Sequence, residues 1–373
     1  GRLLVLVPNQ SGVALSRRIE DEAERERLTA LVEEMVARFG SMGVTGEPAG
    51  FIVRTAAIGA TVDDIAADAR ALAEEWRKVR ETEKRSSVPS VVFHDLDPVA
   101  KTMRDYVSTD TDKVMIDNAE AFAEAQNYCR RAMPELLDRV HLFNGPGALF
   151  ALYDIDGEIE TALEPRVELK SGGWITIETT EALTAIDVNS GRYTAATGLE
   201  DTSVCTNLEA VEEVIYQLRL RGTGGLIVID FIHMNEPENN AKVVEALNVG
   251  FAHDRVPTQI SEMSEFGLVE MTRKRVREPL NKLLTEPAYP SGRPRRKTCA
   301  TMANELMRKV VAEAAATPGR ALIARAAPDV IDWLERGNAY LLDRLRARIA
   351  GDLTLVGEPT FAREHIDVAM GQS

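Results

Sequence analysis

The chain has 373 residues, of which 45% are hydrophobic and 5% aromatic, and its formal net charge at pH 7 is −15. This composition predicts a soluble globular protein of about two to four compact units, without the roughly 20 consecutive apolar residues of a membrane span. The acidic balance argues against a protein that binds any polyanion, because such affinity comes from Lys and Arg.

The first part, residues 1–98, predicts strands alternating with helices. Leu3–Val7 and Gly50–Thr55 are short apolar runs, and Glu22–Phe39 and Val62–Lys84 have helical periodicity, the first of them charge-rich as in a solvated helix. The second strand ends in Arg54 and Thr55, and a guanidinium beside a hydroxyl suits a terminal phosphate. From the residues alone, an arginine paired with a surface carboxylate is the simpler interpretation.

Residues 99–163 predict a short alternation of strand, helix and strand. The strands are Val114–Asp117 and Val140–Phe143, and the helix between them is Ala119–Arg131. Asp117 is interpreted as forming a turn together with Asn118, and not as a metal ligand.

Residues 164–285 carry the candidate chemistry. The apolar alternation of Trp174–Glu178 and Ala182–Asn189 predicts two strands, so Asp187 and Asn189 face the same side. A helix is expected over Thr206–Arg221. The glycine-bounded run Leu226–Ile232 then predicts a buried strand that carries Asp230 near its end.

Two aspartates late in strands of one sheet, with the Asn189 amide nearby, are suited to a hard divalent cation such as Mg²⁺. Such an ion polarises a phosphodiester and lowers the pKa of bound water. Either Asp187 or Asp230 taken alone is better explained as a strand-end turn former. Together they favour a metal site, because a buried carboxylate needs a partner or a metal.

A cluster of basic residues lies near the end of this part. They are Arg273, Lys274, Arg275 and Arg277, and in a strand the three arginines would share one face suited to a phosphate backbone. A solvated, ion-paired edge strand is an equally good interpretation.

The last part begins with a basic, proline-rich linker at residues 286–298. Residues 299–373 then predict helices and strands without a catalytic constellation, namely Met302–Ala315, Ala321–Ala324, Pro328–Gly337, Asn338–Arg346 and Leu353–Val356. The isolated cysteines of the chain form no pairing pattern and suit a reducing cytoplasm; they are Cys129, Cys205 and Cys299.

Several long motifs occur in an order that resembles the catalytic region of the ribonuclease E/G family. They are Gly172–Arg192, Thr206–Ala210, Gln217–Arg221, Gly224–Ile232 and Phe266–Arg275. Fainter similarity runs from Gly1 to about Glu286. The resemblance implies that Asp187 and Asp230 bind Mg²⁺ and that Asn189 assists them. With this family in view, the basic cluster predicts that Arg273, Lys274 and Arg275 contact the RNA backbone.

The resemblance also implies a pocket that senses a 5′-monophosphate on RNA. Arg54 and Thr55 match its side chains, and Gly1 and Val5 fall where its backbone contacts are made. Pro257 stands where the family commonly has a basic residue, which predicts weaker sensing. His233 stands where relatives usually have Asp; a general base is one interpretation, and a substitution that lowers negative charge near the metal is the plainer one.

Two features of the family are expected to be missing. Ala288 and Ser291 occupy the positions of the zinc-link cysteines, so zinc is not expected and any homo-oligomer must use other contacts. The chain also begins after the position of the N-terminal OB-fold RNA-binding domain, which predicts weak gripping of single strands.

The predicted fold class is α/β in the broad α+β multidomain sense, with the domain names taken from the resemblance. The domains are a 5′-sensor domain at 1–98, a ribonuclease H-like subdomain at 99–163, a DNase I-like catalytic domain with a mixed sheet at 164–285, the linker at 286–298 and a small C-terminal domain at 299–373. The predicted function is a cytoplasmic, Mg²⁺-dependent endoribonuclease acting on single-stranded RNA. A catalytically weakened RNA-binding or scaffold protein is the alternative, and a small-molecule phosphatase is a distant third.

Overall fold

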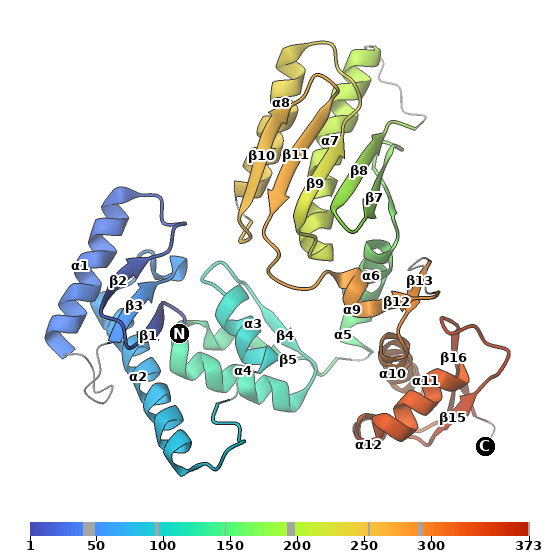
Figure 1. The fold of residues 1–373 in the computed structure, drawn as a ribbon. Helices are drawn as coiled ribbons and strands as arrows, with labels where there is room; N and C mark the ends of the chain where they lie inside the picture. Colours follow the sequence, from blue (N-terminus) through green and yellow to red (C-terminus); the bar gives the residue numbers. More distant parts are fainter. Residues whose placement is uncertain are drawn as a thin grey trace. The chain divides into compact units, whose positions relative to one another are not determined.

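The computed structural model describes residues 1–39, 49–93, 97–145, 147–191, 198–252, 254–289 and 294–371 (Figure 1). Contacts divide the chain into two compact units, Gly1–Gly145 and Pro146–Ser373. This division falls inside the range 99–163 that the sequence assigns to one subdomain, and residues 147–163 belong to the second unit. The finer division into five parts stays a prediction.

The first unit opens with a three-stranded sheet of order β1-β3-β2, formed by β1 (Leu4–Pro8), β2 (Gly12–Leu15) and β3 (Ala49–Val53). Helices α1 (Glu22–Phe39) and α2 (Val62–Arg85) pack beside it. The α1 helix is not solvated on all sides as its charge suggested. It buries Leu28, Val32 and Met35, whose spacing places them on one helical face.

A second core in this unit joins α3 (Pro98–Tyr106) and α4 (Ala119–Ala132) to the parallel strands β4 (Val114–Ile116) and β5 (Val140–Leu142). A 3₁₀ turn, η2 (Pro134–Arg139), leads into β5. Asn118 is the N-cap of α4 and accepts a hydrogen bond from the Ala121 amide, as expected of a residue at a turn.

The second unit contains a six-stranded mixed sheet of order β10-β11-β9-β8-β7-β6. Only β8 and β9 pair in parallel; the other neighbours are antiparallel. The strands are β6 (Arg166–Glu168), β7 (Trp174–Thr179), β8 (Leu183–Asn189), β9 (Gly225–Asp230), β10 (Thr258–Met263) and β11 (Leu268–Arg273). The mixed sheet expected for this region is therefore present.

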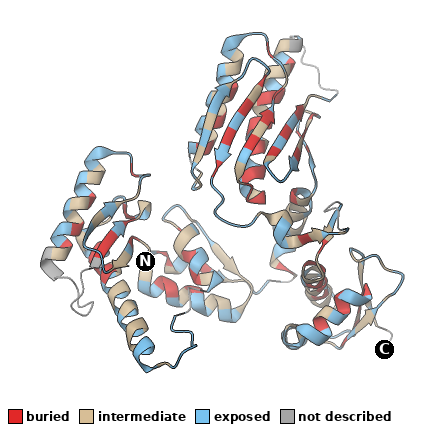
Figure 2. Cartoon of the chain, in the orientation of Figure 1, coloured by how far each residue is buried: buried red, intermediate tan, exposed pale blue. Residues whose placement is uncertain are grey.

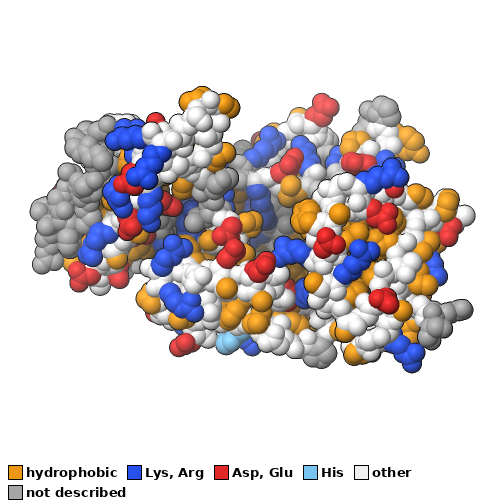
Figure 3. Space-filling model, turned by 90° about the horizontal axis from the view of Figure 1, so that it is seen from below, with side chains coloured by type: hydrophobic (Ala, Val, Ile, Leu, Met, Phe, Trp, Pro, Cys, Tyr) orange, Lys and Arg blue, Asp and Glu red, His pale blue; other side chains and the backbone are white. Residues whose placement is uncertain are grey.

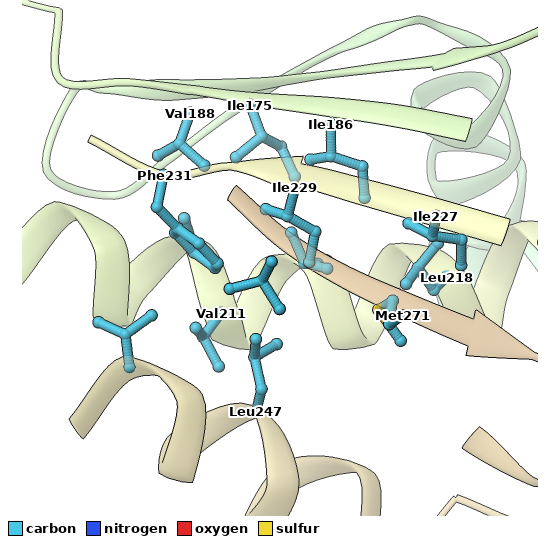
Figure 4. Packing of buried hydrophobic residues seen from close by; sticks show 14 of the residues in the cluster. Ile175, Ile186, Val188, Val211, Leu218, Ile227, Ile229, Phe231, Leu247 and Met271 are labelled. Atoms are coloured by element: carbon cyan, nitrogen blue, oxygen red, sulfur yellow. The ribbon is translucent and has the colours of Figure 1, made fainter. Parts of the chain in front are cut away.

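Helices α7 (Leu199–Arg221) and α8 (Pro237–Ala252) cover one face of this sheet (Figure 1). Figure 4 shows that buried side chains from β7, β8, β9 and β11 point toward these helices, with Ile186 and Ile229 among them. Along β8 and β9 buried residues alternate with exposed ones (Figure 2). The sheet thus has one helix-covered face and one open face.

The remainder of the second unit consists of short elements and a small three-stranded sheet. Helix α6 (Ile155–Leu163) packs on α5 (Leu149–Leu152) and on α9 (Leu280–Leu284). Helix α9 in turn contacts the hairpin of β12 (Thr285–Pro287) and β13 (Arg295–Lys297). The last sheet has the order β15-β14-β16 and packs on α10. Its elements are α10 (Cys299–Ala316), β14 (Leu322–Ala326), α11 (Pro328–Asp332), η3 (Trp333–Gly337), α12 (Ala339–Arg348), β15 (Leu353–Gly357) and β16 (Ile366–Met370).

Candidate functional site

The parallel pair β8 and β9 brings two carboxylates together on the open face. Asp187 and Asp230 are direct partners in the strand register, and both are exposed. Their neighbours Ile186, Val188 and Ile229 are buried on the opposite face. Because adjacent strands lie about 4.8 Å apart, both carboxylates can reach one ion on this face.

The expectation that Asp230 is buried is wrong. The run Leu226–Ile232 is not covered on both sides, since β9 has one face against α7 and α8 and the other open. Leu226 is 42% exposed and belongs to the open face as well. The two aspartates therefore favour a cation because their charges are paired and not because they are buried.

Asn189 lies two residues beyond Asp187 on the same face and contacts it. Its Nδ2 donates a hydrogen bond of 2.7 Å to Oδ2 of Asp187. Gly173, just before β7, allows the chain to pass close by, because a Cβ there would lie 2.5 Å from the Asn189 carbonyl oxygen. The amide thus fixes one carboxylate and leaves its own side-chain oxygen available.

The donor set fits a hard cation that keeps water ligands. Opposed like charges destabilise a sheet, and neither Asp187 nor Asp230 has a Lys or Arg partner among the described residues. Within the same described ranges no three His, Cys, Asp or Glu side chains cluster into a fuller ligand set. Two carboxylates with several waters match what Mg²⁺ accepts, whereas Zn²⁺ sites usually have more protein ligands.

The segment after Asp230 is fixed by a residue that the sequence reasoning missed. Asn207 is fully buried in α7, donates from Nδ2 to the Ile232 carbonyl (2.8 Å) and accepts from the Ile232 amide at Oδ1 (3.0 Å). His233, the next residue, is exposed. An Asn inside a helix at a core-facing position was the signal available in the sequence.

Glu200 was also missed, and it holds the entry to α8. Its carboxylate accepts from the amides of Asn235 (3.0 Å) and Glu236 (3.2 Å) and from Nδ2 of Asn239 (2.9 Å). The hydrogen bond from the Asn235 amide, followed by that from the Asn239 side chain, lowers the pKa of Glu200 to about 2. The carboxylate is therefore ionised wherever the protein is folded near neutral pH.

Basic residues at the end of β11 do not form the expected row. The strand ends at Arg273, so the alternation does not extend to Arg275 and Arg277. Arg273 itself is buried on the helix-covered side, lies 3.0 Å from Asp254 and donates to the Thr223 carbonyl.

The two later arginines are bound to backbone. Arg275 donates from Nε to the Gly224 carbonyl and Arg277 donates to the Arg219 carbonyl, while Lys274 is exposed. Arg273 is thus committed to the fold, and Lys274 and Arg275 are the members of the predicted RNA path that remain at the surface.

A hollow of about 450 Å³ lies near this end of the sheet. It is lined by Gly225, Leu226, Pro257, Gln259, Thr272, Arg273 and Lys274. Pro257 gives it an apolar wall at the position where the resemblance predicted a basic residue. Leu226 lies near the start of β9 and Asp230 at its end, four residues later. The hollow and the paired aspartates are therefore at different ends of this strand.

In the first unit, the expected phosphate pocket shows an arginine already paired. Arg54 donates to the Gly1 carbonyl (2.7 Å) and to Oδ1 of Asp105 (3.0 Å), and the hydroxyls of Thr55 and Ser16 lie 3.1 Å apart. Hydrogen bonds from Arg104 and then Arg54 help to lower the pKa of Asp105 to about 2. This matches the interpretation of Arg54 as an ion-paired surface arginine.

Val5, the other predicted backbone contact, is 42% exposed on β1 and lies opposite Ile52. Of the two zinc-link positions, Ser291 lies outside the described residues. The Ala288 amide donates to the Pro294 carbonyl across the β12–β13 hairpin. Glu286 in that hairpin pairs with Arg296 and Arg363.

On the face that Figure 3 shows, Lys and Arg side chains lie among Asp and Glu side chains. No helix in the described part of the chain is both apolar and long enough to traverse a bilayer.

The family model and the similar proteins that match this chain all point to one family. The family model described as "Ribonuclease E/G family" matches residues 1–276. The chain is 36% identical over 370 residues to Ribonuclease G of Salmonella typhimurium (strain SL1344), covering 99% of this chain and 74% of that protein. It is similarly 36% identical to Ribonuclease G of Haemophilus influenzae, with the same shares covered. It is 37% identical over 277 residues to Ribonuclease E of Haemophilus influenzae, covering 74% of this chain and 29% of that protein.

The Glu200 clamp predicts an acid-sensitive component of stability. A carboxylate whose pKa is lowered from 4.5 to about 2 on folding stabilises the protein fully above about pH 4.5, and this contribution is lost as pH falls toward 2. Glu200→Gln should flatten the dependence of the free energy of unfolding on pH in that window, measured by urea titration. An unchanged pH profile in the variant would remove this role of Glu200.

The buried pair of Arg273 and Asp254 predicts a large structural effect. Asp254→Ala leaves an arginine that is 4% exposed without its carboxylate, and should lower the free energy of unfolding by about 3–5 kcal/mol. Asp332→Ala, which removes the exposed partner of Arg336, serves as control and should cost about 1 kcal/mol or less. Equal effects in chemical denaturation would show that Arg273 is not a structural residue.

Proposed function

We propose, since this chain belongs to the ribonuclease E/G family, that it is an endoribonuclease that cleaves single-stranded RNA with Mg²⁺ and leaves a 5′-phosphate and a 3′-hydroxyl. The family match and the ribonuclease names of the relatives support the hydrolase and endonuclease activity. The dependence on Mg²⁺ and the single-stranded substrate are proposals from the site and from the resemblance.

The observation that carries the proposal is the register of β8 and β9. It pairs Asp187 with Asp230 on an open, water-accessible sheet face, beside the Asn189 amide. When bound between these groups, Mg²⁺ would polarise the phosphodiester and lower the pKa of an attacking water. The open face leaves room for an extended RNA strand to reach the two carboxylates.

Each side chain then has a distinct role. Asp187 and Asp230 would hold the cation, whose positive charge would offset the repulsion between the two carboxylates. Asn189 keeps Asp187 in one orientation through its 2.7 Å hydrogen bond, and its side-chain oxygen can accept a further hydrogen bond. His233 follows on the segment fixed by Asn207, and an imidazole there adds no negative charge, unlike the aspartate usual at that position.

The proposal predicts that either aspartate is required for cleavage. Asp187→Asn and Asp230→Asn should each lower the rate of Mg²⁺-dependent cleavage of a fluorescent single-stranded RNA by at least about a hundredfold, because one charged ligand is lost. Glu270→Gln is the matched control, as Glu270 is an exposed carboxylate on the neighbouring β11. Normal cleavage by both Asn variants would refute the metal assignment.

Sensing of a 5′-monophosphate by Arg54 and Thr55 is a second part of the proposal. Arg54 lies beside the Gly1 carbonyl at the start of the chain, with Val5 on the adjoining strand. A phosphate would replace Asp105 on the Arg54 guanidinium. The side chains of Arg54 and Asp105 are 33% and 32% exposed, so breaking this ion pair requires little free energy. Arg54 is thus suited to a phosphate that competes with Asp105.

This part predicts a substrate preference. The chain should cleave 5′-monophosphorylated RNA about tenfold faster than the same RNA with a 5′-hydroxyl, and Arg54→Gln should reduce the ratio to about one. Arg77→Gln, which removes an exposed ion pair with Glu81 in the same unit, should leave the ratio unchanged. No preference in the unaltered chain would contradict the sensor while leaving the aspartates as proposed.

The wider role is proposed from the family. The protein would process and degrade ribosomal, transfer and messenger RNA in the cytoplasm. Its chain would be divided into five parts: the sensor, ribonuclease H-like, DNase I-like, linker and C-terminal regions. A homo-oligomer would form without a zinc link, since Ala288 and Ser291 provide no thiolate.

A catalytically weakened RNA-binding protein is the second candidate. Three observations favour it: Arg54 already has a carboxylate partner, Pro257 provides an apolar wall, and His233 replaces an acid. RNA binding that needs no Mg²⁺, without cleavage, would select this candidate over the first.

A further inference from the structure

One arginine shares a cross-strand row with the paired aspartates. In the register of the sheet Arg166 lies opposite Thr176, Thr176 opposite Asp187, and Asp187 opposite Asp230. Val167, next to Arg166, is buried in the core, so Arg166 is on the open face. Two strand spacings separate its Cα from that of Asp187, a distance of about 10 Å.

This arginine is the only cationic side chain that the strands contribute to the open face. All residues of β6–β11 are described, and they include two arginines and no lysine. The other arginine, Arg273, is buried on the helix-covered side. The other charged side chains that the strands present on the open face are carboxylates, including those of Glu178 and Glu270.

The side chain of Arg166 is held in place by an aromatic ring. Its guanidinium carbon lies 4.0 Å from the ring centroid of Trp174, which is opposite Asn189 in the register. Its Nε donates to Glu168 at 2.7 Å, but both side chains are more than half exposed, so this ion pair is weak. A stacked guanidinium with an exchangeable carboxylate partner is prepared to bind a phosphate.

We propose that Arg166 binds a backbone phosphate of the RNA next to the phosphate at the Mg²⁺ that Asp187 and Asp230 would hold, and that Trp174 is the positioning residue for its guanidinium. The inference rests on the proposed function, because it places the RNA strand along this row of the sheet. The phosphate replaces Glu168 on Arg166, while the stack on Trp174 keeps the guanidinium over the sheet. The strand then leaves the metal site toward β7 and β6.

The test measures binding separately from cleavage. The full chain, with a chelator and without divalent cations, is titrated into a fluorescein-labelled single-stranded RNA at several salt concentrations, and anisotropy gives Kd. Arg166→Gln should weaken binding about tenfold at low salt. The slope of log affinity against log salt should become shallower by about 0.7, the value for one phosphate contact to a single strand.

Three variants make the result specific. Arg166→Lys keeps the charge and should retain the salt slope, but it should weaken binding because the planar, stacked fork is lost. Trp174→Leu should weaken binding without changing the slope, and Trp174→Tyr should restore it, as expected of a positioning role. Arg336→Gln removes an 81% exposed arginine elsewhere in the second unit and should change nothing.

Each outcome separates the two proposals. Equal Kd and equal slope for Arg166→Gln and Arg336→Gln would overturn the Arg166 contact, even if Mg²⁺-dependent cleavage is found. RNA binding that depends on Arg166, without cleavage in Mg²⁺, would support the contact and overturn only the nuclease. An unaltered chain that binds no RNA in this titration would overturn the Arg166 contact, and cleavage in Mg²⁺ would then decide the nuclease separately.

Discussion

The parallel pairing of β8 with β9 is the constraint on which the candidate site depends. It is the one parallel pair in a sheet that is otherwise antiparallel, and α7 makes the crossover between its strands. Parallel strands end at the same edge, so carboxylates late in both strands meet there. A slip of one residue would turn Asp187 into the core, and the hydrophobic neighbours Ile186 and Val188 make that slip costly.

The α7 helix links this pairing to the rest of the site. Its apolar residues cover the sheet, its buried Asn207 binds both backbone groups of Ile232, and Glu200 near its start holds the entry to α8. The end of β9 is thereby fixed on the helix side by hydrogen bonds as well as by packing. The side chains that stabilise the sheet lie on the helix-covered face, so residues on the open face are available for binding.

Arginines in this acidic chain divide by the kind of partner they have. Arg273 is fully engaged by Asp254 and a carbonyl in a buried position, where exchange of partners would leave unpaired charge. Arg54 and Arg166 instead have partly exposed carboxylate partners, Asp105 and Glu168. An exposed ion pair contributes little to stability, so a phosphate can replace the carboxylate at low cost. Selective RNA contacts are thus compatible with a net charge of −15.

The sequence by itself determined most of the local structure. Period-two alternation placed Asp187 and Asn189 on one face of a strand, and apolar periodicity located α1, α2 and α4 with nearly their observed bounds. The ordered motifs also identified the family. Such features depend on residues a few positions apart, which a sequence displays directly.

Only the tertiary structure decided which of these residues meet. The pairing of Asp187 with Asp230, the exposure of Asp230 and the burial of Arg273 follow from strand order and from the side that the helices cover. The hydrogen bonding of Asn207 to Ile232, 25 positions away, likewise exists only in the folded protein. The physical reason is that cross-strand register and burial are set by the whole hydrophobic core, and no local pattern contains them.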